Sequence, residues 1–326
     1  MSSENDKAYD IVIVVLTYNN EKTIAQCLQA ISSQNYPKGS YKALVIDNGS
    51  TDSTLEIVKA FNIDYHVFPK MTIGQLRNEG AKRAKAPVVG FIDSDCEVSS
   101  DWIISVLKHF KDDRVGIAGC MYDLPPQPSF VERHWIGKPC VNMAENRLIP
   151  AGNMAVSKRI FNEIGGFDEK LISGEDVYLL NQARLHGYKT IYDPTIKNIH
   201  FGNPKTIADL YRKEIWYGIR GDSIINRIKA FDKAFIASNV VLLIAASLII
   251  GLMRFNIRII LSACLSFLML SLASAMDRKY VKKVDGNLFY MTFFYSIYLL
   301  GRMHSLVHVY GNKKHVYVKN GYCSGK

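Results

Sequence analysis

The chain has 326 residues, of which 48% are apolar, and a formal net charge of +10. This length accommodates one medium-sized catalytic domain and a smaller second part. The six cysteines form no CxxC pair and no zinc-finger spacing, which excludes a cysteine-based metal finger and is typical of reduced thiols in the cytoplasm. The positive charge alone fits nucleic acid, an anionic lipid surface or a phosphorylated substrate.

Strand, polar loop and helix alternate along the first part of the chain. The apolar, β-branched run 10–16 predicts a buried strand, and apolar residues at helical spacing after it predict a helix. The unit recurs, so the expected elements are strands over 10–16, 41–46, 65–68 and 88–92, and helices over 21–33, 53–61 and 74–84. This alternation predicts an α/β fold with a mostly parallel sheet, helices on both faces, and the polar loops that follow the strands at one edge.

Two carboxylates, Asp93 and Asp95, follow the strand 88–92. At the carboxyl end of a parallel strand, side chains spaced i, i+2 face the crevice where ligands bind, so this pair can hold one hard divalent cation. The alternative is a solvated turn with a cap for the helix that begins near Trp102, because Asp and Ser favour turns and caps for local reasons. Polar residues in the neighbouring loops distinguish a cation site from a solvated turn.

Further elements follow this acidic segment. We expect helices over 102–110 and 175–186, strands over 115–121, 148–156 and 190–192, and a loop over 124–139 that contains four prolines. From residue 206 to residue 233, apolar side chains alternate with many basic ones. That pattern is typical of a helix that lies on a membrane surface.

The longest apolar runs lie in the last third of the chain. Residues 235–253 and 259–276 are uncharged, and each run is long enough to cross a hydrocarbon core of about 30 Å as a helix. The segment 288–309 either spans the membrane or lies in its interface, and the sequence leaves both open. Two membrane helices favour a lipid surface, rather than nucleic acid, as the partner of the positive charge.

The expected orientation follows from the ends of the chain and its basic loops. Residues 1–10 are polar and lack the apolar stretch of a secretory signal, so we expect the catalytic part in the cytoplasm. The basic loop 277–283 then lies on the cytoplasmic side, as the positive-inside bias favours. The expected organisation is a multi-pass protein of the cell membrane with a polar tail (1–9), a catalytic domain (10–205), an amphipathic segment (206–233), a membrane part (234–309) and a basic tail (310–326).

An ordered set of motifs resembles the family 2 glycosyltransferases, which have the GT-A fold. The resemblance covers roughly residues 11–202, and the set is more specific than any single motif. Its members are Thr17-Tyr18-Asn19, Asp47 to Asp52, Gly74, Arg77-Asn78, Gly80, Asp93-Ser94-Asp95, Gly152 to Ala155, Gly165 to Asp168, Gly174-Glu175-Asp176 and His200.

The resemblance implies a nucleotide-diphosphate sugar donor, a UDP- or GDP-sugar. It implies that Asp47 accepts hydrogen bonds from base or ribose, and that Arg77 offers donors to the diphosphate, although a carboxylate after a strand is often a cap and a lone Arg is often solvated. The remaining residues implied on the donor side are Thr17, Tyr18, Asn19, Asn78, Asp93 and Ser94.

The resemblance also implies a bound Mn²⁺ or Mg²⁺ that neutralises the charge of the leaving nucleotide. Asp95 is the implied direct ligand, with Asp93 touching metal or sugar. His200 is the implied third ligand, and an imidazole suits Mn²⁺ better than Mg²⁺. Glu97 is a rival for that position, and a His merely packed at a strand end is the alternative.

Transfer with inversion needs a base that takes the proton of the acceptor hydroxyl. The resemblance implies Asp176 in this role, with Glu175 beside it, although carboxylates at a helix start also compensate the helix dipole. Gly152 and Asn153 are implied on the acceptor side. With an ionised lipid phosphate as acceptor, the need for a base weakens and the acidic pair would orient the acceptor.

Processive members of the family carry a Gln-x-x-Arg-Trp motif, whereas this chain has Tyr211 to Trp216 at that place, which favours transfer of a single sugar. We therefore expect a hexosyltransferase-type enzyme of polysaccharide or glycoconjugate biosynthesis. Its expected acceptor is lipid-linked, a polyprenyl or dolichyl phosphate or a lipid-linked glycan. The alternatives are a sugar nucleotidyltransferase, which would carry a Gly-rich loop after the first strand, and a non-catalytic membrane scaffold with the same fold. Sugar, nucleotide and oligomeric state stay open.

Overall fold

The computed structural model describes residues 9–137, 142–145, 147–219, 224–229, 232–281, 284 and 286–311. The expected tails 1–9 and 310–326 and the basic loop 277–283 lie wholly or partly outside the described residues. The strands are β1 (Ile11–Thr17), β2 (Tyr41–Asp47), β3 (Asp64–Val67), β4 (Val88–Asp93), β5 (Cys96–Val98), β6 (Val115–Gly119), β7 (Ala144–Glu145), β8 (Asn153–Ser157), β9 (Lys189–Tyr192) and β10 (Asn198–His200). The helices that cover them are α1 (Ile24–Ser32), α2 (Thr54–Ala60), α3 (Ile73–Arg83), α4 (Trp102–Leu107), α5 (Lys158–Glu163) and α6 (Glu175–Leu185).

Within the described residues, the main sheet has the strand order β3-β2-β1-β4-β8-β6-β9-β7. The strands β1, β2, β3 and β4 run parallel, as expected, with Thr17 opposite Asp47 and Leu16 opposite Asp93. These strands therefore end at the same level, and their polar loops open at one edge. β8 is antiparallel to both β4 and β6, so the sheet is mixed at its centre.

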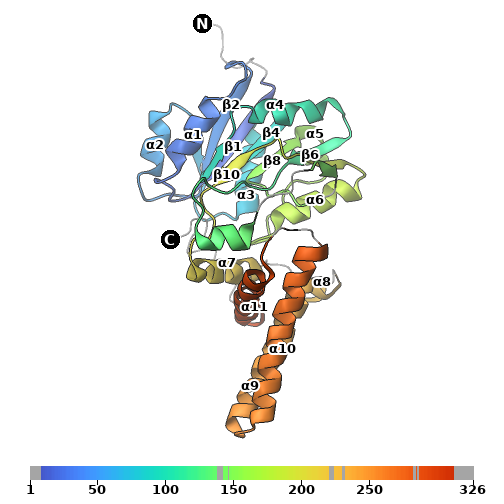
Figure 1. The fold of residues 1–326 in the computed structure, drawn as a ribbon. Coiled ribbons are helices and arrows are strands. Elements are labelled where there is room, and N and C mark those ends of the chain that lie inside the picture. The colour runs from blue at the N-terminus through green and yellow to red at the C-terminus, as the bar shows by residue number, and fades with distance from the viewer. Residues whose placement is uncertain are drawn as a thin grey trace.

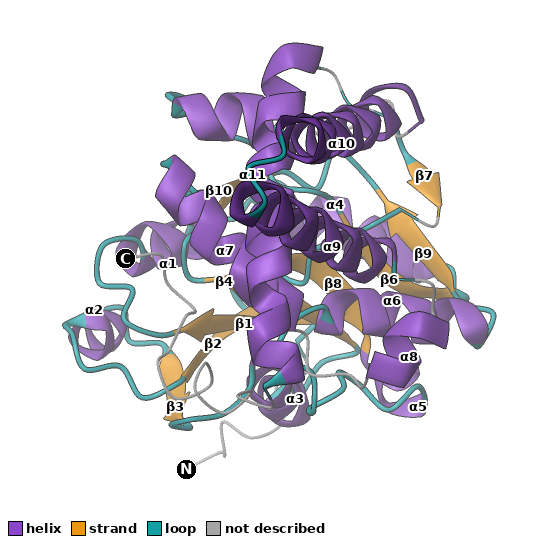
Figure 2. Ribbon diagram, turned by 90° about the horizontal axis from the view of Figure 1, so that it is seen from below, coloured by secondary structure: helices purple, strands orange, loops and turns teal. Residues whose placement is uncertain are grey.

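Helices cover both faces of this sheet (Figures 1 and 2). On one face Gly80 of α3 packs directly against Val14, where the lack of a side chain lets helix and strand approach closely. On the other face the fully buried indole of Trp102 in α4 lies over Gly90 of β4. The two close contacts fix the α/β part as one continuous core around β1 and β4.

A second, two-stranded sheet was not expected from the sequence. Its strands β5 and β10 pair antiparallel, with His200 opposite Cys96. Strands this short carry little periodicity, and their pairing joins segments far apart in the chain. The pairing brings His200 to the end of β4.

Two expected elements differ from the structure. The strand expected over 148–156 begins only at Asn153, because the preceding residues form a turn in which Asn153 N donates to the Pro150 carbonyl. The loop expected over 124–139 contains a π-helical turn, Glu132–Ile136. Ser129 and Glu132 cap one another at its start, each backbone N–H donating to the other side chain, which supplies the local signal for a helical turn.

The C-terminal part is helical, with α7 (Ile207–Ile219), α8 (Ile224–Lys229), α9 (Lys233–Met253), α10 (Ile257–Met276) and α11 (Leu288–Tyr310). α9 and α10 form a hairpin that projects away from the α/β part (Figure 1). These two helices are long and apolar enough to cross a membrane, and most of their surface is exposed. The helices expected over 235–253 and 259–276 are thus confirmed.

α11 covers the expected segment 288–309 and packs along α7, beside the α/β part (Figure 1). Gly301 lets the two helices approach, since a Cβ there would lie 2.9 Å from the Cβ of Glu214. A buried ion pair, Arg302 Nε to Glu214 Oε2 at 2.9 Å, joins them. The amphipathic segment expected over 206–233 is therefore broken into helices, of which α7 is sandwiched between α11 and the α/β part.

Candidate active site

Three polar loops meet at the carboxyl ends of β1, β2 and β4, as the sequence predicts. The loop after β1 is tied to the loop after β2, because Asn19 N donates to Ser50 Oγ and Thr51 N donates to Asn19 Oδ1, both at 2.8 Å. It is tied to the loop after β4 as well, through Asn20 Nδ2 and Ser94 Oγ at 2.5 Å. These bonds hold the expected donor-side residues Asn19 and Ser94 in one rigid edge.

Asp47, Thr17 and Tyr18 form the end of this edge. Asp47 is fully buried, and its carboxylate accepts hydrogen bonds from Gly49 N, Ser50 N and Ser50 Oγ. In the structure, the Asp47 side chain stabilises the turn formed by residues 47–50. Thr17 is buried opposite Asp47, while Tyr18 is half-buried at the loop surface. Their contact with a nucleotide stays a prediction.

Arg77 lies buried beneath the edge and joins two acidic segments. Its Nη1 is 2.5 Å from Glu175 Oε1, and its Nη2 is 3.0 Å from Asp93 Oδ1. The expected contact with a diphosphate would have to compete with these two carboxylates. The position is costly to disturb, because removing one partner of a buried ion pair leaves an uncompensated charge, a loss of about 3–5 kcal/mol.

The side chain next to Arg77 holds a third segment. Asn78 accepts a hydrogen bond from Phe167 N and donates to the Phe167 carbonyl and to Glu169 Oε1. It thereby fixes the loop that leads to α6, and its contact with a donor stays a prediction.

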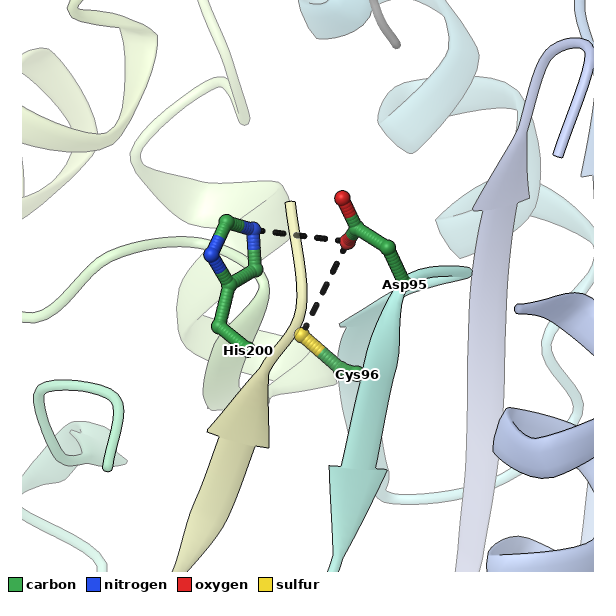
Figure 3. A group of neighbouring side chains, drawn as sticks. All are labelled: Asp95, Cys96 and His200. Carbon is green, nitrogen blue, oxygen red and sulfur yellow. Dashed lines mark hydrogen bonds and ion pairs between the residues drawn. The ribbon is translucent and has the colours of Figure 1, made fainter. Parts of the chain in front are cut away.

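Asp95, Cys96 and His200 bring three ligand atoms within 4.8 Å of one another (Figure 3). His200 Nε2 lies 3.4 Å from Asp95 Oδ1. Glu97, the rival third ligand, instead accepts a hydrogen bond from Gln26 Nε2. Asp93 does not join this group, because its carboxylate is held by Arg77 and by Tyr122 Oη.

The imidazole of His200 is oriented for ligation by its neighbours. Asn203 donates through Nδ2 to the His200 carbonyl, so its Oδ1 faces His200 Nδ1 at 2.9 Å and takes the proton there. Nε2 is then the ring nitrogen that faces Asp95 and is available to a cation. Tyr122 stacks on the ring, with centroids 4.4 Å apart and planes 18° apart. Such outer partners commonly fix the tautomer of a metal-bound His.

The chemistry of these atoms fits a divalent cation. Burial opposes ionisation of Asp95, but the adjacent His200 lowers its pKa below the usual value, which leaves a carboxylate ligand. Burial, with Asp95 and Asp93 nearby, raises the pKa of the Cys96 thiol well above its usual value, so this sulfur stays protonated and is a poor ligand for a hard ion. A carboxylate and an imidazole match Mn²⁺ better than Mg²⁺.

Glu175 and Asp176 begin α6 on the other side of Arg77. Glu175 is buried, and its carboxylate forms an ion pair with Arg77. Asp176 is half-buried, and Oδ1 accepts a hydrogen bond from Val177 N. Burial and the neighbouring Glu175 raise the pKa of Asp176 to about 7. Of the two, Asp176 is the carboxylate suited to take a proton near neutral pH.

The two residues expected on the acceptor side lie beneath the surface. Asn153 is fully buried, and its amide bonds Trp102 Nε1 and the carbonyls of Cys120 and Ile196. A Cβ on Gly152 would overlap the Asp93 carboxylate. Both residues support the floor of the site, and an acceptor contact of the Asn153 side chain would need that network to open.

Four residues at the site escaped the sequence analysis: Tyr122, Cys96, Asn203 and Lys213. Tyr122, in the loop after β6, and Lys213 of α7, whose Nζ donates to the Gly202 carbonyl, lie far along the chain from Asp95, so no local pattern points to them. Asn203 follows His200 by three residues, and Cys96 follows Asp95 directly. That proximity is a signal, since the residues around a metal ligand commonly orient it.

Residues 12–161 match the model of glycosyl transferase family 2. This part of the chain belongs to that family. Glycosyltransferase AglE of Haloferax volcanii is 27% identical over 223 residues, which cover 64% of this chain and 71% of AglE. The Methanococcus voltae enzyme named dolichyl N-acetyl-alpha-D-glucosaminyl phosphate 3-beta-D-2,3-diacetamido-2,3-dideoxy-beta-D-glucuronosyltransferase is 37% identical over 81 residues, covering 23% of this chain and 25% of that enzyme. The chain spans less than a third of several other curated relatives of the family 2 domain.

A solved structure confirms the expected GT-A fold. The mannosyltransferase PcManGT from Pyrobaculum calidifontis, in complex with GDP-Man and Mn²⁺, superposes with a TM-score of 0.61 at 16% sequence identity. The match covers 93% of this chain and 88% of PcManGT. The similarity thus includes the helical part that follows the family 2 domain.

Proposed function

We propose that the protein is a membrane-anchored, inverting, metal-dependent glycosyltransferase that moves one sugar from a UDP- or GDP-sugar to a lipid-linked acceptor. The observation that carries the proposal is the pairing of a cation site with a base. Asp95 and His200 would form the cation site, and Asp176 follows Glu175, the ion-pair partner of Arg77. Asp95 and Arg77 lie within the family 2 match over residues 12–161, and Asp176 and His200 follow it.

Asp95 and His200 would hold the Mn²⁺ or Mg²⁺ ion, which when bound supplies positive charge to the diphosphate that leaves with the nucleotide. The chain's own residues do the rest. The tied loops hold the nucleotide edge, Arg77 anchors β4 to α6, and Asp176 takes the proton of the attacking acceptor hydroxyl. An Asp with a pKa near 7 supports a hydroxyl acceptor, because an ionised phosphate acceptor needs no base.

The helical part supports a lipid-linked acceptor. The hairpin α9–α10 is apolar and exposed, with Leu243, Met253 and Leu265 among its outward side chains. A soluble protein rarely leaves so large an apolar surface uncovered. The name of the Methanococcus voltae relative describes a dolichyl sugar phosphate, a lipid-linked sugar that carries hydroxyls.

The proposed organisation follows the expected boundaries, with a catalytic domain over 10–205, a juxtamembrane segment over 206–233 and a membrane part over 234–309. The basic charge favours the cytoplasmic face for the catalytic domain. The proposed location is the cell membrane, and the proposed role is in the synthesis of a polysaccharide or glycoconjugate. Family 2 membership favours sugar transfer over nucleotidyl transfer.

The test uses the full chain purified in lipid nanodiscs with a panel of UDP- and GDP-sugars. We expect one donor to raise the melting temperature only when MnCl₂ or MgCl₂ is present, and we expect EDTA to abolish release of the nucleotide. Asp95→Asn should lose the metal-dependent part of both signals, because an amide replaces the charged ligand. Asp64→Asn, an exposed carboxylate on β3, is the matched control and should behave as wild type. Equal donor turnover in EDTA and in Mn²⁺ would refute the proposal.

A further inference from the structure

α7 presents one basic side chain to the cation site. Lys213 Nζ donates to the carbonyl of Gly202 at 3.3 Å. Gly202 itself lies against Asp95, since a Cβ at this position would overlap the Asp95 carboxylate. Gly202 therefore contacts both the ammonium group of Lys213 and the proposed metal ligand Asp95, although Lys213 and Asp95 are distant in the sequence.

The charge of Lys213 reaches both proposed ligands. After burial and His200, Lys213 is a further influence on Asp95, and it favours the ionised carboxylate. Its effect on the pKa of His200 has the same direction as that of burial and is opposed by the larger effect of Asp95, so Lys213 is close to both residues.

Lys213 differs from its neighbours on α7 in having no acidic partner among the residues that the structure describes. Arg212 is exposed and pairs with Asp209 at 2.7 Å, and Glu214 pairs with Arg302 of α11. Within the described part of the chain, Lys213 has no carboxylate within salt-bridge distance. One turn further along α7, the Tyr217 ring lies 5.9 Å from Lys213 Nζ, and the Tyr217 carbonyl accepts a hydrogen bond from Ser173 Oγ, three residues before Asp176. The face of α7 that carries Lys213 and Tyr217 thus lies between the cation site and the proposed base.

We propose that Lys213 binds a phosphate oxygen of the substrate held at the Asp95–His200 site, so that the helix next to the membrane part completes the phosphate-binding site. This inference rests on the proposed function. Within the described residues, this half-buried ammonium group uses one of its three N–H donors in a hydrogen bond, so the other two are suited to an anionic group that bridges to the metal. The phosphate belongs either to the diphosphate of the donor or to the lipid phosphate of the acceptor.

The test compares Lys213→Met, which removes the charge but keeps the length, with Lys213→Arg and with Arg212→Met as the control on the same helix. Binding of UDP and of GDP to full-length protein in nanodiscs with MnCl₂ is measured by calorimetry. The Michaelis constants for the donor and for a polyprenyl-phosphate-linked acceptor are measured in parallel. Thermal melting shows that each variant is folded.

We expect Lys213→Met to weaken nucleoside-diphosphate binding about 10-fold or more, as for loss of a hydrogen bond between charged groups, and Lys213→Arg to restore most of it. Arg212→Met should bind as wild type. Unchanged nucleotide binding with a similar rise in the Michaelis constant for the acceptor would assign the contact to the lipid phosphate. Wild-type values for Lys213→Met in both assays, in a protein that transfers sugar, would overturn the inference alone. A wild-type protein that neither binds UDP or GDP nor transfers sugar would refute the proposed function together with it.

Discussion

Glu175 and Asp176 are adjacent in the sequence, but Arg77 separates their chemistry. The guanidinium is 2.5 Å from Glu175, whereas among the described residues Asp176 has only a backbone N–H of its own helix as hydrogen-bond partner. Burial and the charge of Glu175 therefore raise the pKa of Asp176 to about 7. A carboxylic acid is an efficient general base at neutral pH only when its pKa is raised in this way.

The raised pKa predicts how sugar transfer depends on pH. Below pH 7 Asp176 is protonated and cannot accept the acceptor proton, so the rate should fall about 10-fold per pH unit and level off above pH 7. Asp176→Asn should lower kcat about 100-fold or more and remove this limb of the profile. The measurement is kcat/KM between pH 5 and pH 9 with a hydroxyl acceptor.

The control for this experiment is Asp168→Asn, a carboxylate in the loop before α6 that should keep the wild-type profile. An Asp176→Asn enzyme with normal kcat and an unchanged pH limb would contradict the base assignment. Normal activity of that variant only with a phosphate acceptor would instead show that Asp176 serves hydroxyl acceptors alone.

The sequence predicts which residues lie at the site better than it predicts what those residues contact. Asp93 and Asp95 could be predicted from the residues alone, because the end of a buried strand is marked locally by polar residues that follow an apolar run. Asp176 and His200 are implied only by the resemblance to the family. What each carboxylate contacts could not be predicted. Asp93 is hydrogen-bonded to Arg77 and Tyr122, and Asn153 is buried among three hydrogen-bond partners. These tertiary contacts leave no local pattern in the sequence.

At the scale of elements, the contact between α7 and α11 links the α/β part to the apolar hairpin. A glycine on each helix permits it, because Gly218 faces Ser305 and Gly301 faces Glu214 and the Tyr211 carbonyl. Small residues at a helix crossing let the backbones approach, and the contact then depends on shape. Lys213 is carried by the same helix, so the position of its ammonium group follows this packing.

Gly301→Leu should destabilise the protein. A side chain at this position meets the backbone oxygen of Tyr211 at 3.1 Å, which cannot move unless α7 shifts. The gain in helix propensity is about 1 kcal/mol, whereas overpacking of a close contact costs about 1–3 kcal/mol, so we expect a net loss of about 1 kcal/mol and a lower melting temperature in nanodiscs. Val307→Leu, on an exposed face of α11, is the control. A melting temperature at or above the wild-type value would show that the two helices do not pack closely.

The elements with strong local periodicity could be predicted, and those made by pairing could not. β1, β2, β4 and their helices lie within a few residues of the expected bounds, because continuous apolar runs and helical spacing are local signals. The antiparallel insertion of β8 and the small sheet β5–β10 depend on partners distant in the chain. The proline content of 124–139 also concealed the capping pair Ser129 and Glu132.

At the scale of the whole molecule, the charged surface of the α/β part and the apolar surface of the helical hairpin lie apart. The α/β part, with its charged loops, lies at one end, and the hairpin α9–α10 projects from the other, with α7 and α11 between them (Figures 1 and 2). If the hairpin lies in a bilayer, the site sits just outside the head groups, where a lipid-linked acceptor presents its polar end. The net charge of +10 then favours an anionic leaflet.

The hairpin should therefore determine membrane attachment, which a pair of charge substitutions can test. Leu243, near the middle of α9, is 68% exposed, and Leu265, near the middle of α10, is 60% exposed. A Lys at the centre of a membrane helix costs about 3 kcal/mol, so Leu243→Lys with Leu265→Lys should disfavour insertion by about 6 kcal/mol. We expect wild-type protein to resist alkaline carbonate extraction and the double variant to be extracted. Leu185→Lys, at a 78% exposed position on α6, should resist extraction as wild type does. Complete extraction of the wild-type protein would show that the apolar hairpin is covered by another protein surface, and the acceptor would then have to reach the site from solution.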